Sequence, residues 1–221
     1  MDISRLKSAP DIPAPKRILR GSILTAILGF VTITAVKAIQ SPWQVDDFPE
    51  ALAIKVELLP TIFPLHMISA GLALLLIPLA IALRPDAHRS PRWHRIAGRI
   101  AAVDVAIAGV TALPVALAAP VTRVSAAGFA AQGLTWLLLL ALGIRHIRAR
   151  RAAQHRVCML LMAATASGAV FFRIYLALWA ILGTERYFEA FYALDAWIAW
   201  LGPLSATAVL IKQTGSRNAA A

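Results

Sequence analysis

The sequence predicts an all-α fold, a polytopic membrane helical bundle with six transmembrane helices and both termini in the cytoplasm. Three observations predict it. Of the 221 residues, 59% are hydrophobic, and the mean hydropathy is +0.71. Only 15% are charged, whereas about a quarter of an average soluble domain is charged. The apolar residues form runs long enough to cross a bilayer, with basic residues concentrated in alternate connections between them.

Six segments contain the roughly 20 apolar residues that a membrane-spanning helix needs. We expect helices in all of them, because lipid offers no hydrogen-bond partner to a strand edge. The third is interrupted by Pro114, but membrane helices tolerate proline. The second to fifth are expected to form an antiparallel four-helix core, with the first and sixth packed around it. The six segments are approximately 20–40, 60–83, 99–119, 124–144, 157–182 and 190–211.

The segments outside these runs are short. Residues 1–19 are proline-rich and are expected to be a disordered cytoplasmic tail, residues 20–211 one transmembrane domain, and residues 212–221 a second cytoplasmic tail. The first run faintly resembles a signal peptide, but it is long for one and Lys37 disfavours cleavage, so we expect a retained helix. After it, a short surface helix is expected from about Pro49 to Leu59.

The distribution of charge predicts the orientation. The two tails and the connections at 84–99 and 145–156 hold 17 of the 22 basic residues, while the opposite connections hold seven of the 11 acidic ones. By the positive-inside rule, both termini are cytoplasmic in a cytoplasmic (inner) membrane. The net charge of +11 therefore reflects membrane topology and not nucleic-acid binding. The expected partners are the lipid bilayer and other membrane proteins.

Polar residues within the outer half of the membrane are candidates for function, because a charge there costs roughly 2.5–3.5 kcal/mol on insertion scales. His66 in the second segment and Arg173 in the fifth lie at similar depth, and Asp195 can join them. The sequence thus predicts an outer cluster of these three residues. Two alternatives stay open: Arg173 can extend to the headgroups, and a neutral His66 needs only one hydrogen bond.

A second group of candidates lies at the inner side. Asp104 is expected to pair with an inner-loop arginine or with His155. His94 and His155 form the one histidine pair suited to a single b-type haem, and nearby arginines could hold its propionates. Both histidines lie at the membrane boundary, however, which is poorly shielded for a haem. The flanking arginines are Arg95, Arg99 and Arg156. The lone Cys158 excludes an internal disulfide, and no metal site is expected.

One face of the fifth segment connects the inner and outer candidates. Helical periodicity places His155, Met159, Met162, Ala166, Ala169 and Arg173 on it. The stretch "MAATASGA" at 162–169 is rich in small residues, which permits close helix approach. We expect this face to point into the bundle.

Several motifs resemble the bacterial membrane proteins catalogued as domain of unknown function 2306. The motifs are "LHMISAGLALLLIPLAIALR", "RWHRIAGRI", "RAAQHRVCMLLMAATASGAVFFRIYLAL" and "FYALDAWIAWLGP". The similarity covers about residues 60–205. It marks the positions of His66, His94-Arg95-Gly98-Arg99, His155-Arg156-Met159, Arg173 and Trp197-Trp200. The chain departs from the family where a glutamine usually follows the proline of its first core helix, because Leu79, Ala80 and Ile81 follow Pro78 here. The resemblance marks residues that matter but implies no activity.

Three classes of function fit these observations. The first is a non-enzymatic accessory or structural membrane protein, in which the His-Arg pairs anchor helices. The second is a haem- or quinone-linked redox protein that uses His94 and His155. The third is a small transporter or sensor with a polar site at His66 and Arg173. The sequence contains no nucleotide loop, nucleophile elbow or zinc HExxH motif, which argues against hydrolase or ATPase chemistry.

Overall fold

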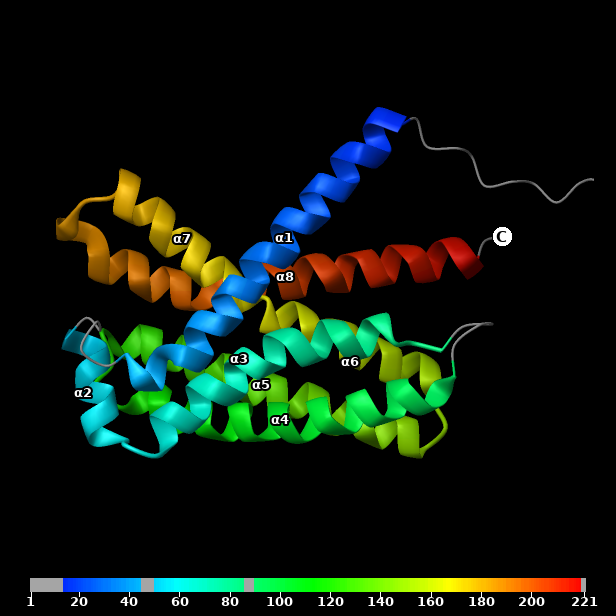
Figure 1. Ribbon diagram of the computed structural model, residues 1–221, viewed down its shortest axis with the longest axis horizontal. Coiled ribbons are helices and arrows are strands. Elements are labelled where there is room, and N and C mark those ends of the chain that lie inside the picture. Colours follow the sequence, from blue (N-terminus) through cyan, green and yellow to red (C-terminus); the bar gives the residue numbers. More distant parts are fainter. Residues whose placement is uncertain (1–13, 45–49, 86–89, 220–221) are drawn as a thin grey trace, which may run out of the picture.

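The computed structural model describes residues 14–44, 50–85 and 90–219, and the regular elements in these ranges are all helices (Figure 1). This confirms the all-α prediction. Six helical stretches are long and apolar enough to span a membrane, as predicted. In chain order the elements are α1 (Ala14–Gln40), η2 (Ser41–Trp43), α2 (Glu50–Leu58), α3 (Ile62–Ala82), α4 (Pro91–Leu117), α5 (Arg123–Arg148), α6 (Ala152–Ala166), α7 (Gly168–Leu182), η4 (Glu185–Tyr187) and α8 (Phe188–Ala219).

Helices α1, α4 and α6 begin at least five residues before the apolar runs suggest, α6 at Ala152 and not near residue 157. Helix α1 starts at Ala14, so the end of the expected disordered tail is helical, while residues 1–13 lie outside the described ranges. Helix α4 starts at Pro91 and not near residue 99. The Ser90 hydroxyl accepts a hydrogen bond from the backbone N–H of Arg92 at 3.3 Å, and proline is favoured at the first helical position. The stretch "PRWHRIAG" is therefore the start of a helix.

The fifth span is broken into α6 and α7 at Ser167, and Figure 1 shows α7 leaving the line of α6. Ser167 donates from its hydroxyl to the Ala164 carbonyl at 2.7 Å, and the N–H of Val170 bonds the Ser167 carbonyl at 2.9 Å. Such local bonds from serine and tightened turns bend membrane helices. The single face expected from His155 to Arg173 is thus divided between two helices.

Four consecutive spans contribute equally to the main core. Its buried residues come in pairs from α3, α4, α5 and α6, and they are Ala73, Ile77, Val105, Ala108, Trp136, Leu140, Met162 and Ala166. A smaller cluster of Ala35, Leu74 and Val170 joins α1, α3 and α7. The two halves of the broken span therefore belong to different clusters: Met162 packs in the first and Val170 in the second. Burial on both sides of the break fixes where α7 lies.

Gly168, the residue after the break, lies where three helices approach closely. A Cβ atom at Gly168 would lie 2.6 Å from the Cβ of Trp200 in α8 and 2.7 Å from Nε2 of Gln132 in α5. The position is buried. A larger residue would push α7 away from both neighbours.

We expect Gly168→Ala to destabilise the protein by about 1–3 kcal/mol, the usual cost of overpacking a filled core. Gly202→Ala is the matched control, because Gly202 in α8 has no atom within 4 Å of the added Cβ. Thermal unfolding of both variants in detergent tests this expectation. Equal midpoints for the two variants would show that the contact around Gly168 is not tight.

Candidate functional site

His66, near the start of α3, is held against α4. Its Nδ1 lies 3.1 Å from the Ala108 carbonyl oxygen and 3.3 Å from Oγ1 of Thr111. A carbonyl only accepts, so Nδ1 carries the hydrogen. The Thr111 hydroxyl itself donates to the Ile107 carbonyl at 2.7 Å. His66 therefore keeps an Nε2 lone pair that no bond to α4 uses.

Arg173 lies one turn beyond Val170 in α7, within electrostatic range of His66. Its Nη1 donates to the Ala169 carbonyl of the same helix at 2.8 Å. Among the described residues, no carboxylate pairs with this guanidinium. The structure thus places two of the three predicted outer residues near each other, and one of them is a cation without a counter-charge.

The third residue, Asp195, does not join them, so the predicted cluster is only partly formed. Asp195 in α8 is completely buried, and neither carboxylate oxygen has a hydrogen-bond partner within the described part of the chain. The surrounding stretch of α8 is held against α5: Trp197 donates from Nε1 to the Val124 carbonyl at 3.1 Å. A Cβ at Gly128 would lie 2.8 Å from the Ala196 carbonyl oxygen. This close packing of α8 on α5 determines where Asp195 lies.

The two inner histidines make the same kind of bond in successive hairpins. Nδ1 of His94 in α4 lies 2.9 Å from the Ala80 carbonyl oxygen of α3, and Nδ1 of His155 in α6 lies 2.9 Å from the Gly143 carbonyl oxygen of α5. Ala80 is in the last turn of α3, where carbonyls lack helical partners. Each histidine therefore ties together the two helices of its own hairpin. Nδ1–H donation to a carbonyl also orients a histidine for ligation through Nε2.

The arginines beside these histidines lie on the surface. Arg95, Arg99 and Arg156 are all exposed, which suits side chains at the membrane–water boundary. Arg95 and Arg99 project from the first turns of α4, and Arg156 from the first turns of α6. Their positions fit the anchoring role expected for the His-Arg pairs.

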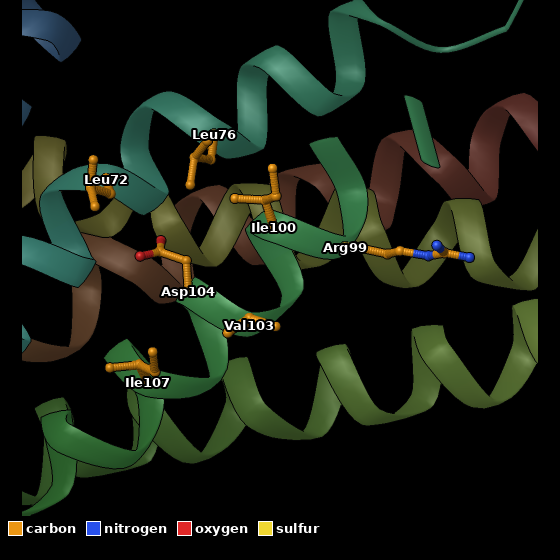
Figure 2. Close-up of a pocket in the computed structure, with 7 residues that line it drawn as sticks. All are labelled: Leu72, Leu76, Arg99, Ile100, Val103, Asp104 and Ile107. Atoms are coloured by element: carbon orange, nitrogen blue, oxygen red, sulfur yellow. The ribbon is translucent and has the colours of Figure 1, made fainter. Parts of the chain in front are cut away.

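Within the described part of the chain, Asp104 does not form the ion pair expected with an inner-loop arginine or His155. Its side chain is 9% exposed, and Oδ2 is buried without a hydrogen-bond partner. Arg99 precedes it by five residues, which is about 140° around a helix. Figure 2 shows the Arg99 side chain extending away from the Asp104 carboxylate. Asp104 instead lines a groove between α3 and α4.

Lys55 has a role that its sequence context did not reveal. From the short helix α2 it donates through Nζ to the Val115 carbonyl at 3.0 Å and also to the Ala118 carbonyl, at the C-terminal end of α4. A positive charge there interacts favourably with the helix dipole. Burial lowers the pKa of Lys55 from its usual value. The sequence does not predict these bonds, because a lysine in a connection between helices adds one positive charge whichever partner it has.

Comparison with family profiles shows to which protein family the chain belongs. The profile of a family described as predicted membrane protein (DUF2306) matches residues 63–211, about two thirds of the chain. The protein belongs to this family. The match begins just before His66 and includes every histidine, arginine and aspartate considered above as a candidate. No curated protein and no solved structure matches the chain significantly. The DUF2306 match establishes a membrane protein and leaves the activity to be argued from the site.

Proposed function

We propose that this protein is a non-enzymatic transporter or sensor that binds a small anion between His66 and Arg173. The observation that carries the proposal is the Arg173 guanidinium, which lies inside a membrane span without a carboxylate partner among the described residues. An intramembrane charge is costly unless it is paired or used. A ligand anion would supply the missing charge.

The direction of the Arg173 side chain argues against simple extension to the headgroups. Helix α7 ends at Leu182, near the turn that leads to α8, so its C-terminal end is the end at the membrane surface. The guanidinium bonds the carbonyl of Ala169, a full turn nearer the membrane interior. A snorkelling arginine would extend the other way. The charge is therefore held toward the centre of the bilayer.

His66 supplies the second half of the proposed site. Because Nδ1 donates to α4, Nε2 can take up a proton and donate to an anion held by Arg173. Binding of the anion would then bring a proton with it. The break at Ser167 between α6 and α7 is consistent with this function, because transporters place their ligand sites at discontinuous helices.

We further propose the orientation on which the inner and outer sides depend. Figure 1 supports it by placing the start of α1 and the end of α8 at one end of the molecule, with α2 and the α7–α8 turn at the other. The first end also carries the basic connections. By the positive-inside rule it is cytoplasmic, in the cytoplasmic membrane. The central unit is then an antiparallel bundle of α3, α4, α5 and α6, while α7 leaves this bundle and packs on α8.

The orientation predicts which positions a membrane-impermeant maleimide reaches in intact spheroplasts. In a Cys158→Ser background, Thr184→Cys between α7 and α8 should be labelled from outside. Ala149→Cys, between α5 and α6, should be labelled only after the membrane is permeabilised. The reverse pattern would contradict the proposed orientation.

The anion site predicts that anions stabilise the wild-type protein and that Arg173→Met removes this effect. Thermal midpoints of detergent-purified protein would be measured in chloride, nitrate, phosphate and acetate at constant ionic strength, with gluconate as the reference anion. A ligand at 100 times its Kd stabilises by about 2.7 kcal/mol, so a rise of several degrees is expected for at least one anion. Arg173→Met should show none.

The matched control is Arg186→Met, because Arg186 is exposed in η4 and lies against the Tyr187 ring at 5.4 Å. This variant should keep the full response to anions. The proposal would be refuted by an unchanged response in Arg173→Met, or by a wild-type protein that responds to none of the four anions.

A further inference from the structure

A groove on the bilayer-facing side of α3 and α4 is separate from the His66–Arg173 site. Its volume is about 460 Å³, and its walls are mostly apolar: Leu72 and Leu76 from α3, and Ile100, Val103 and Ile107 from α4. Val103 is 64% exposed and Ile100 53%. These walls suit an apolar chain supplied by the membrane.

The polar group in this groove is the carboxylate of Asp104. Figure 2 shows it projecting from α4 toward α3, between the apolar side chains. The side chain is more than nine-tenths buried, and Oδ2 has no hydrogen-bond partner among the described residues. A buried acceptor without a donor costs free energy. An occupant of the groove that carries a hydroxyl would remove this cost.

Arg99 gives the groove a cationic end. Its side chain extends away from Asp104, toward the start of α4 (Figure 2), and it is exposed. Five residues of helix separate the two positions along the axis by roughly 7 Å. From the membrane boundary inward, the groove therefore presents a guanidinium, then a carboxylate, and then an apolar surface.

We propose that this groove binds a lysophospholipid, a phospholipid with one acyl chain and a free glycerol hydroxyl. The phosphate would bind Arg99, the hydroxyl would donate to the Asp104 carboxylate, and the acyl chain would lie over Leu72, Val103 and Ile107. The order of groups in such a lipid matches their order in the groove. A two-chain phospholipid lacks a free hydroxyl between its phosphate and its acyl chains, because both of those glycerol positions are esterified. A quinol lacks the anionic group that Arg99 would bind.

Binding of 1-oleoyl lysophosphatidic acid to the detergent-purified full chain tests the proposal. The second probe is its 2-deoxy analogue, which lacks only the glycerol hydroxyl. We expect the analogue to bind about tenfold more weakly, the effect of losing one hydrogen bond to a charged group. Phosphatidic acid should bind more weakly as well. Equal affinity for lysophosphatidic acid and its deoxy analogue would overturn the proposal.

Variants identify which residue binds the hydroxyl of the lipid and which binds its phosphate. Asp104→Leu should bind the lysolipid and its deoxy analogue equally and, since it removes an unpartnered carboxylate, should unfold at a higher temperature than the wild type. If this variant fails to fold, Asp104→Asn takes its place. It should reduce the difference in affinity between the lysolipid and its deoxy analogue. Arg99→Gln should weaken the binding of both lipids equally. Arg92 is exposed and lies outside the groove, so Arg92→Gln should leave both affinities unchanged.

Two outcomes would contradict the assignment. If a folded Asp104 variant still binds lysophosphatidic acid more tightly than its deoxy analogue, the hydroxyl is recognised by another residue. Binding of decylubiquinol that depends on Asp104, without binding of the lysolipid, would assign the groove to a quinol instead. Neither result would affect the anion site, because Arg173→Met is measured with inorganic anions and acetate in the absence of lipid probes.

Discussion

Side-chain donors bonded to backbone carbonyls of neighbouring helices hold this bundle together. His66, His94 and His155 each bond a carbonyl of the adjacent helix through Nδ1. The α5–α6 pair has two more such bonds, from Nε2 of Gln132 to the Thr165 carbonyl and from Nε1 of Trp136 to the Met162 carbonyl, both at 3.0 Å. Within lipid, where no water competes, every donor needs a partner in the protein. Backbone carbonyls provide that partner without introducing a second charge.

This constraint makes the exceptions informative. Among the described residues, Oδ2 of Asp104 and both carboxylate oxygens of Asp195 are buried without a donor, and the Arg173 guanidinium bonds a carbonyl of its own helix and no carboxylate. Each of these groups lowers the stability of the bundle. An apolar residue of similar size would pack at the same position without this cost. We infer that ligands complete two of these groups: an anion at Arg173 and a hydroxyl-bearing lipid at Asp104. The two proposed sites lie at different heights along α4, because Asp104 comes one turn before Ala108, the residue whose carbonyl bonds His66.

The spans could be predicted from the sequence because their cause is local. Apolar runs of sufficient length become helices wherever lipid surrounds them, and the short helix α2 was predicted from the proline at its start. Apolar content alone predicts too late a start for α4, because the helix begins at the Ser90-Pro91 cap, before the apolar run. The break at Ser167 was also missed, since small residues predict close packing and bending equally well.

The polar sites were less predictable, because their partners are not local. His66, Arg173 and Asp195 were expected together from their similar depth, but depth does not specify which face of α8 carries Asp195. The bonds of His94, His155 and Lys55 end on backbone carbonyls, which every residue has and no sequence pattern marks. Asp104 and Arg99 line the same groove but do not pair, because the Arg99 side chain extends away from the carboxylate, toward the start of α4. The equivalent bonds of His94 and His155 accord with the similar basic connections of the two hairpins.

The central claim is that His66 and Arg173 together hold an anion. Nitrogen NMR of protein labelled with ¹⁵N-histidine observes this site directly, because Nδ1 and Nε2 shifts distinguish the neutral tautomers from the protonated ring. Without a binding anion, the account predicts a neutral His66 with its hydrogen on Nδ1. Addition of the stabilising anion should protonate Nε2 of His66 and leave the spectra of His94 and His155 unchanged. A His66 signal that does not respond to the anion, or that responds identically in Arg173→Met, would contradict the account.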